Sequence, residues 1–106
     1  MTGAGSGEPG TGAATGATLS RSLVILNQRG LHARAAARFV KCAEQFEADI
    51  TVAKKEAVVS GLSIMGLMML AAGPGTIIEV TATGREAQAA LDALEALVID
   101  KFGEDE

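Results

Sequence analysis

Hydrophobic residues in this chain follow two different patterns, and the change between them marks the predicted secondary structure. Residues 23–26 form a short continuous apolar run that ends in a polar loop, which is typical of a buried strand. Residues 32–46 instead place apolar side chains three or four positions apart, which gives a helix one apolar face. The first part of the pattern therefore predicts a strand, a polar loop and an amphipathic helix.

The remaining segments extend this order to βαββαβα. Residues 49–53 and 57–60 are short and rich in β-branched side chains, and they predict a hairpin. A very apolar helix over 63–71 is closed by Gly73-Pro74-Gly75 and followed by a strand over 76–83. An amphipathic helix over 85–102 is expected to end near Gly103. This order predicts a two-layer α+β domain, in which helices cover one face of a four-stranded, mostly antiparallel sheet.

The two ends of the chain have a different composition. Residues 1–19 are rich in glycine and carry Glu8 as their one charge, so we expect a disordered tail ahead of a folded domain over 20–106. The tail lacks the basic start and apolar run of a secretory signal, and no apolar run in the chain is long enough to span a membrane. The acidic end, Glu104-Asp105-Glu106, is expected to be solvated.

Composition narrows the classes of partner and compartment. A net charge of −4 and an aromatic content of 3% argue against binding to nucleic acids or to anionic membranes. The single cysteine, Cys42, excludes an internal disulfide and fits a reducing compartment, so we expect a cytoplasmic protein. Cys42 shares the inner stripe of its helix with Phe39 and Phe46, and is interpreted as a small buried hydrophobe.

The single histidine stands at the predicted start of the first helix, in Gly30-Leu31-His32-Ala33-Arg34. A helix start presents unpaired N–H groups and the positive end of a dipole, which together suit an anion. An imidazole at that place can act as nucleophile and carry the anion, and Arg34 adds a fixed positive charge nearby. The pattern favours phosphoryl chemistry at His32, against a capping histidine and a solvated arginine with no further role.

The second predicted helix opens with Ser63, which is most simply an N-cap. A phosphate on Ser63 would suit the same helix end, so capping and regulation are compatible, and whether the cell uses this serine stays open. Ile64, Met65 and Met68 cannot all face one core, because consecutive helical residues point about 100° apart. We expect an exposed apolar patch there that binds partners, against a scatter of apolar residues without function.

Other chemistries lack the residues they need. Gly61 and Gly66 have the spacing of a phosphate-binding loop, but Leu67-Met68 replaces its Lys-Ser/Thr pair. One histidine and one cysteine cannot build a structural zinc site, and no hydrolytic triad or carboxylate pair stands out. We expect neither a metal nor a cofactor.

Two motifs in this order resemble the HPr family, the histidine-containing phosphocarrier proteins of the bacterial phosphoenolpyruvate-dependent phosphotransferase system. The resemblance rests on Gly30-Leu31-His32-Ala33-Arg34 together with the segment 63–70, and covers roughly residues 20–102. It implies an open-faced β-sandwich with strand order 1-4-2-3. It also implies that His32 accepts a phosphoryl group from enzyme I and passes it to an EIIA-type acceptor, with Arg34 stabilising the transferred group.

The same resemblance assigns the other candidate residues. Ser63 matches the serine that a dedicated kinase/phosphatase modifies in many bacteria, and Ile64, Met65 and Met68 match the docking surface for partners. The protein would then be a monomeric phosphotransfer protein with a phosphohistidine intermediate, rather than a free-standing catalyst of small-molecule turnover.

Two positions depart from the family pattern. Ala35 replaces a proline that many members have after the arginine, and Leu62 replaces a lysine before the serine. These changes resemble a nitrogen-regulatory or alphaproteobacterial branch, and Leu62 removes a cation that a serine kinase would recognise. Two functions therefore stay open: a phosphocarrier acting through His32 in sugar transport or nitrogen regulation, and a regulatory binding module switched at Ser63.

Overall fold

A four-stranded antiparallel sheet with strand order β1-β4-β2-β3 is the base on which the helices pack. The structure, a computed structural model, describes residues 17–105. Its elements follow one another as β1 (Thr18–Val24), α2 (Ala33–Ala43), β2 (Asp49–Lys54), β3 (Ala57–Ser60), α3 (Ile64–Met69), β4 (Ile77–Thr83), α4 (Ala87–Ile99) and the 3₁₀ turn η1 (Lys101–Gly103). The predicted α+β class, element order and strand order are confirmed.

Alternation along the strands separates a covered face of the sheet from an open one. In β4, Ile78 and Val80 are fully buried, while the intervening Glu79 is exposed, as a period of two residues requires. On the open face, hydroxyl groups pair across strands, as in the 2.9 Å contact between Ser20 and Thr81. One polar face and one apolar face are what an open-faced sandwich needs, because its helices cover only one side.

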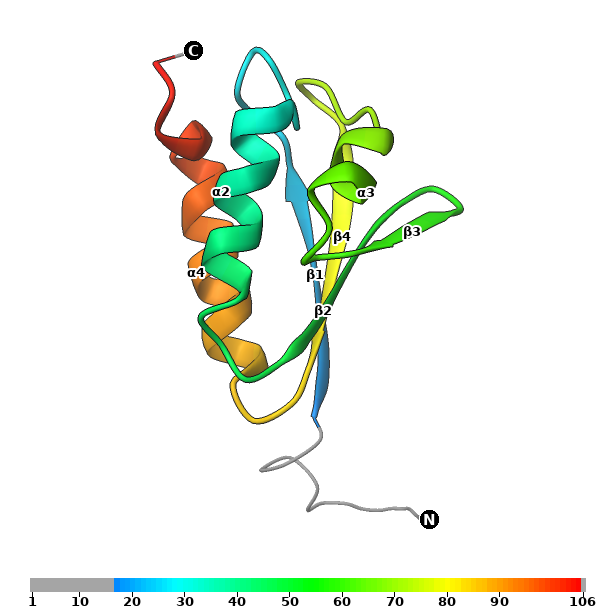
Figure 1. Ribbon diagram of the computed structural model, residues 1–106, viewed down its shortest axis with the longest axis vertical. Helices are drawn as coiled ribbons and strands as arrows, with labels where there is room; N and C mark the ends of the chain where they lie inside the picture. The colour runs from blue at the N-terminus through cyan, green and yellow to red at the C-terminus, as the bar shows by residue number, and fades with distance from the viewer. Residues whose placement is uncertain (1–16, 106) are drawn as a thin grey trace.

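The helices bury their apolar faces in one core against the covered side of the sheet. Figure 1 shows α2 and α4 lying side by side along it, with the shorter α3 near the hairpin of β2 and β3. Each large apolar side chain buried in this way contributes about 1.5–3 kcal/mol relative to its exposure to water. The largest fully buried apolar side chains come from all parts of the fold: Phe39, Phe102, Ile25, Leu67, Ile78, Leu91, Leu94, Val52, Val80 and Val98.

The element boundaries differ from the predicted ones at both ends of the domain. The first strand was predicted over 23–26, but β1 spans Thr18–Val24, so residues 25 and 26 lie beyond its end. The last two residues of the segment assigned to the tail therefore belong to the sheet, and residues 1–16 lie outside the described part. The helix predicted over 85–102 was too long. α4 ends at Ile99, and the positive φ angles of Lys101 and Phe102, 57° and 56°, turn the chain back toward α2.

Cys42 packs against the edge of the core rather than at its centre. Its side chain is partly buried, and burial raises the pKa of its thiol. A thiol that stays protonated is a poor nucleophile, which agrees with the interpretation of Cys42 as a small hydrophobe. Among residues 17–105, no helix combines the length and the apolar character needed to cross a bilayer.

Candidate functional site

His32 lies at the N-terminal end of α2 and caps it. Its backbone is extended (φ −77°, ψ −178°), and its carbonyl accepts the first helical hydrogen bond, from Ala36 N, at 2.8 Å. The imidazole Nδ1 accepts a hydrogen bond from the backbone N–H of Arg34 at 3.3 Å. Nδ1 therefore carries its lone pair toward the helix start, where the unpaired amides of the first turn concentrate positive charge.

The opposite nitrogen of the ring contacts a residue from the C-terminal end of the chain. Nε2 of His32 is hydrogen-bonded to Oε2 of Glu104, and the two side chains are 24% and 13% exposed. A ring nitrogen that accepts cannot also carry a proton, so Nε2 is the protonated one and donates to the carboxylate. The neutral ring is thus held as a single tautomer.

Asn27 completes this group from the loop before α2. Its side chain is fully buried, and Nδ2 donates to Gly30 O at 2.9 Å and to Glu104 Oε1 at 3.0 Å. The flipped amide would place Oδ1 against two acceptor oxygens, so the hydrogen bonds fix its orientation. Each oxygen of Glu104 thereby has its own donor.

The environment of Glu104 favours its charged form. Burial raises the pKa of its carboxyl, but the hydrogen bonds from Asn27 and His32, together with electrostatic attraction to His32 and Arg29, outweigh burial and lower the pKa below its usual value. The expectation that the acidic end is solvated is therefore wrong for Glu104, although Asp105 is exposed.

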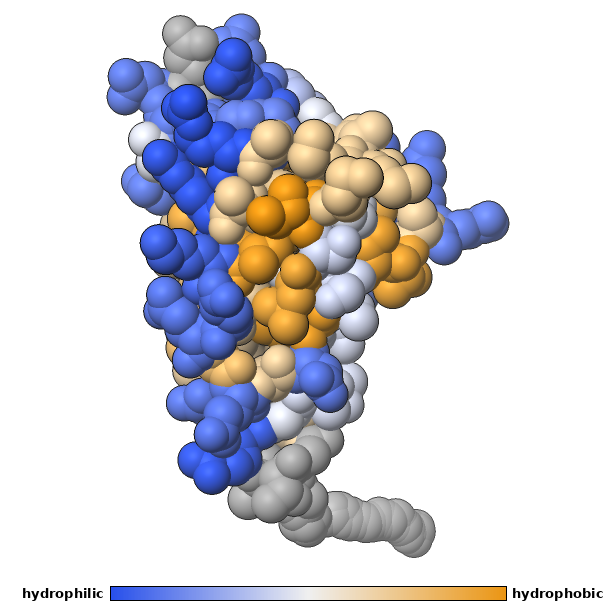
Figure 2. Space-filling view, viewed as in Figure 1, coloured by the Kyte–Doolittle hydropathy of each residue, from blue (hydrophilic) through white to orange (hydrophobic). Residues whose placement is uncertain are grey.

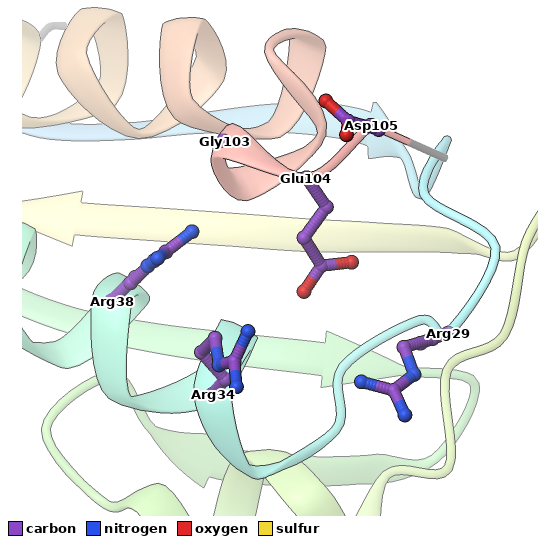
Figure 3. Close-up of a pocket in the computed structure, with 6 residues that line it drawn as sticks. All are labelled: Arg29, Arg34, Arg38, Gly103, Glu104 and Asp105. Carbon is purple, nitrogen blue, oxygen red and sulfur yellow. The ribbon is translucent and has the colours of Figure 1, made fainter.

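Three arginines surround this carboxylate in an open pocket. Its walls are Arg29 from the loop, Arg34 and Arg38 from α2, and residues 103–105 of the C-terminal segment. Figure 3 shows the Glu104 carboxylate pointing into the space between Arg34 and Arg29. Such a pocket suits an anion such as phosphate. Among the residues that the structure describes, no three His, Cys, Asp or Glu side chains cluster as metal ligands would.

Ser63 and the predicted partner-binding residues form a second surface on α3. Ser63 is the N-cap, as predicted, and its Oγ accepts a hydrogen bond from Gly66 N at 2.9 Å. Ile64, Met65 and Met68 are all exposed, by 39%, 71% and 40%. Figure 2 shows apolar side chains gathered over α3 and β3. We call the exposed apolar residues of this face the α3 patch; its members are Leu62, Ile64, Met65, Met68 and Met69.

The α3 patch is connected to His32 through the loop that leaves α3. A shallow hollow beside His32 has Ala71, Ala72 and Gly73 in its wall, and Leu31 N donates to Ala72 O at 2.9 Å. The structure thus brings His32 and Arg34 together at one helix end, and places Ser63 on the adjacent surface rather than in the arginine pocket.

Sequence reasoning missed four residues of the site. Arg38 follows Arg34 by four positions, a spacing that puts both on one helix face and could have revealed it. Arg29 borders the histidine motif. Asn27 and Glu104 carry no local signal, because they meet only through the fold.

Comparison with known proteins decides the family. A family model described as the PTS HPr component phosphorylation site matches residues 19–100. The chain belongs to the HPr family. Phosphocarrier protein HPr of Neisseria meningitidis is 47% identical over 88 residues, which cover 83% of this chain and 99% of that protein. Phosphocarrier protein NPr of Shewanella violacea is 45% identical, with coverage of 81% and 94%.

Solved structures agree with this assignment. HPr-C-His from Thermoanaerobacter tengcongensis aligns with a TM-score of 0.79 and 39% identity, covering 83% of this chain and 99% of that one. HPr-family proteins are phosphocarriers, so the chain works in phosphoryl transfer among the enzymes of the phosphotransferase system. The resemblance drawn from the two sequence motifs is confirmed.

Proposed function

We propose that His32 accepts a phosphoryl group on Nδ1 from phosphorylated enzyme I in the cytoplasm and passes it to an EIIA-type acceptor. The observation that carries the proposal is the position of His32 as N-cap of α2, with Nδ1 facing the first turn. The acceptor belongs to a sugar-transport or a nitrogen-regulatory pathway, since the relatives include both an HPr and an NPr.

The surroundings of Nδ1 suit a group that is transferred and then released. The phosphoryl group brings a charge of about −2 near neutral pH to a helix end where a negative charge gains about 0.3–1 kcal/mol. Arg34 lines the adjacent pocket and stabilises the transferred oxygens. The stabilisation is modest, so transfer onward stays easy.

The α3 patch is the surface on which we propose that both donor and acceptor dock. Ile64, Met65 and Met68 offer flexible apolar side chains, which adapt to partners of different shape. The loop from this patch to the hollow beside His32 would bring a docked partner close to the imidazole.

Incubation with phosphoenolpyruvate and enzyme I tests this function. We expect one acid-labile phosphate on the wild-type protein and none on His32→Ala, whereas Ser63→Ala should label like wild type. Labelling of His32→Ala at the wild-type level, or an unlabelled wild-type protein, would contradict the proposal.

A second candidate function is a regulatory binding module switched by phosphorylation of Ser63. The observation in its favour is that Ser63 lies at a helix N-terminus between exposed Leu62 and Ile64. A phosphate there would be stabilised by the helix end, yet would place about −2 charge within an apolar docking surface. Phosphorylation of Ser63 would then release partners without any change at His32.

A kinase assay combined with partner capture separates the two functions. For a Ser63 switch, HPr serine kinase/phosphatase with ATP should label wild type but not Ser63→Ala, and His32→Ala should capture the same partners as wild type. Absence of acid-stable label from wild type, or loss of partners from His32→Ala, argues against the switch.

A further inference from the structure

We propose that Glu104 is a positioning residue for phosphoryl transfer: its carboxylate holds the His32 ring with Nδ1 toward the start of α2 and balances the positive charge that the ring acquires. The proposal rests on the proposed function of His32. It gives a role to a residue at the end of the chain, 72 positions away from the histidine.

The C-terminal segment is built to hold this carboxylate in place. After α4 ends, Phe102 turns back and inserts into the core, where it is fully buried. Its carbonyl accepts a hydrogen bond from Arg38 Nη1, which ties η1 to α2. Glu104 follows two residues later, so a fixed backbone rather than a free tail delivers its side chain to His32.

The contacts of Glu104 allow the imidazole ring of His32 only one orientation. Oε1 is taken by Asn27 Nδ2 at 3.0 Å, and Asn27 itself is anchored by Gly30 O. Oε2 accepts from Nε2 of His32, and the Arg34 N–H occupies the lone-pair side of Nδ1. Rotating the ring by half a turn would exchange its nitrogens for carbons and lose both bonds, so Nδ1 stays the nucleophile.

The charge balance of the transfer shows what the carboxylate contributes. The Arg34 N–H releases Nδ1, whose lone pair forms the new N–P bond, while the bond between phosphorus and the donor breaks and its electron pair stays with the donor. The Nε2 proton remains on the ring, so the ring changes from neutral to cationic. Glu104 is the carboxylate bonded to that N–H, and it therefore stabilises the transition state and the phosphorylated product more than the free histidine.

An alternative role for Glu104 is that of a competitor: its carboxylate, which lies among three arginines, would occupy the site that the phosphoryl group needs and so inhibit transfer. Glu104, however, binds Nε2, and the incoming group binds Nδ1 on the other side of the ring. The two groups therefore do not exclude each other. The competitor reading also gives the opposite sign in an experiment, because removal of the carboxylate would then speed transfer.

Glu104→Gln is the informative substitution. Glutamine puts an NH₂ group where Glu104 has one of its two oxygens, so either Asn27 Nδ2 or His32 Nε2 then faces a donor instead of an acceptor. We expect the ¹⁵N chemical shifts of the His32 ring to show loss of the Nε2–H tautomer. Because a hydrogen bond to a charged group is worth more than one between neutral groups, phosphorylation by enzyme I should slow about five- to tenfold.

Two matched variants complete the test. Glu44→Gln makes the same change at an exposed residue at the opposite end of α2 from His32, and should keep wild-type shifts and rates. Glu104→Asp keeps the charge on a shorter side chain and should recover part of the rate. Wild-type shifts and an unchanged or faster rate in Glu104→Gln would overturn the proposal.

The readouts also distinguish failure of this inference from failure of the proposed function. A wild-type protein that takes no phosphate from enzyme I would refute the carrier function, whatever the ring shifts show. Normal phosphorylation of both wild type and Glu104→Gln would refute the role of Glu104 alone.

Discussion

Gly30 has a left-handed backbone conformation, which other residues adopt only at a cost in free energy. It also lies where there is no room for a side chain. Its φ is +66°, and a Cβ built there would lie 2.3 Å from the carbonyl oxygen of Ala72. The same carbonyl accepts the N–H of Leu31 at 2.9 Å, so the close approach joins the histidine loop to the loop after α3. The glycine therefore sets the path of the chain into His32.

Gly30→Ala should consequently disturb both stability and function. The left-handed backbone alone costs an L-residue about 1–2 kcal/mol, and a contact of this length with backbone atoms forces a further shift. We expect the free energy of unfolding in urea to fall by at least that amount, and phosphorylation at His32 to slow.

Gly73→Ala is the matched control, because a Cβ there meets nothing within 4 Å and Gly73 does not belong to the positive-φ glycines. It should unfold at nearly the wild-type urea concentration. Equal loss of stability in the two variants would show that the close approach of Gly30 to Ala72 does not cause the loss.

At the scale of elements, sequence periodicity predicted the order and type of the four strands and three α-helices, because each is a local pattern of apolar side chains, but it placed the first strand over 23–26 instead of 18–24. The two sheet faces and the inner stripes of α2 and α4 follow from it directly. His32 and Arg34 could be found for the same reason, since they are two residues apart at a predicted helix start. Ser63 as an N-cap is likewise a local prediction.

The C-terminal segment shows why the rest could not be predicted. An apolar stripe through residues 85–102 suggests one continuous helix, and nothing before Gly103 signals an end. The helix ends at Ile99, and the positive φ angles of Lys101 and Phe102 turn the chain so that Phe102 is fully buried; tertiary packing here overrides helical preference. Contacts separated by 72 and 77 positions, from Glu104 to His32 and Asn27, depend on that break.

At the scale of the whole molecule, two neighbouring surfaces have different chemistry. The net charge is −4, yet the pocket beside His32 gathers Arg29, Arg34 and Arg38. The α3 patch next to it is apolar. A partner that brings a phosphoryl group would meet positive charge where the anion moves and an apolar face where the proteins touch. The division separates the chemistry of transfer from recognition.

Met65→Lys tests whether recognition depends on the α3 patch. Met65 is 71% exposed, so the substitution should leave the free energy of unfolding within about 0.5 kcal/mol of wild type. A charge buried in an apolar interface is costly, and we expect kcat/KM for phosphorylation by enzyme I to fall at least about tenfold, equivalent to about 1.4 kcal/mol.

Ile77→Lys is the control that isolates the place of the new charge from the charge itself. Ile77 is 61% exposed on the open face of the sheet, opposite the side that the helices cover, and the substitution changes the net charge of −4 by the same unit. Steady-state phosphorylation by a fixed amount of enzyme I, with the concentration of each variant varied, should give wild-type kinetics for Ile77→Lys and a raised KM for Met65→Lys. If both variants slow equally, long-range charge rather than contact with the α3 patch governs the encounter. If neither variant slows, enzyme I docks on another face. Any complex that used the α3 patch would have to bury the lysine at position 65, and burial of that charge would slow phosphorylation.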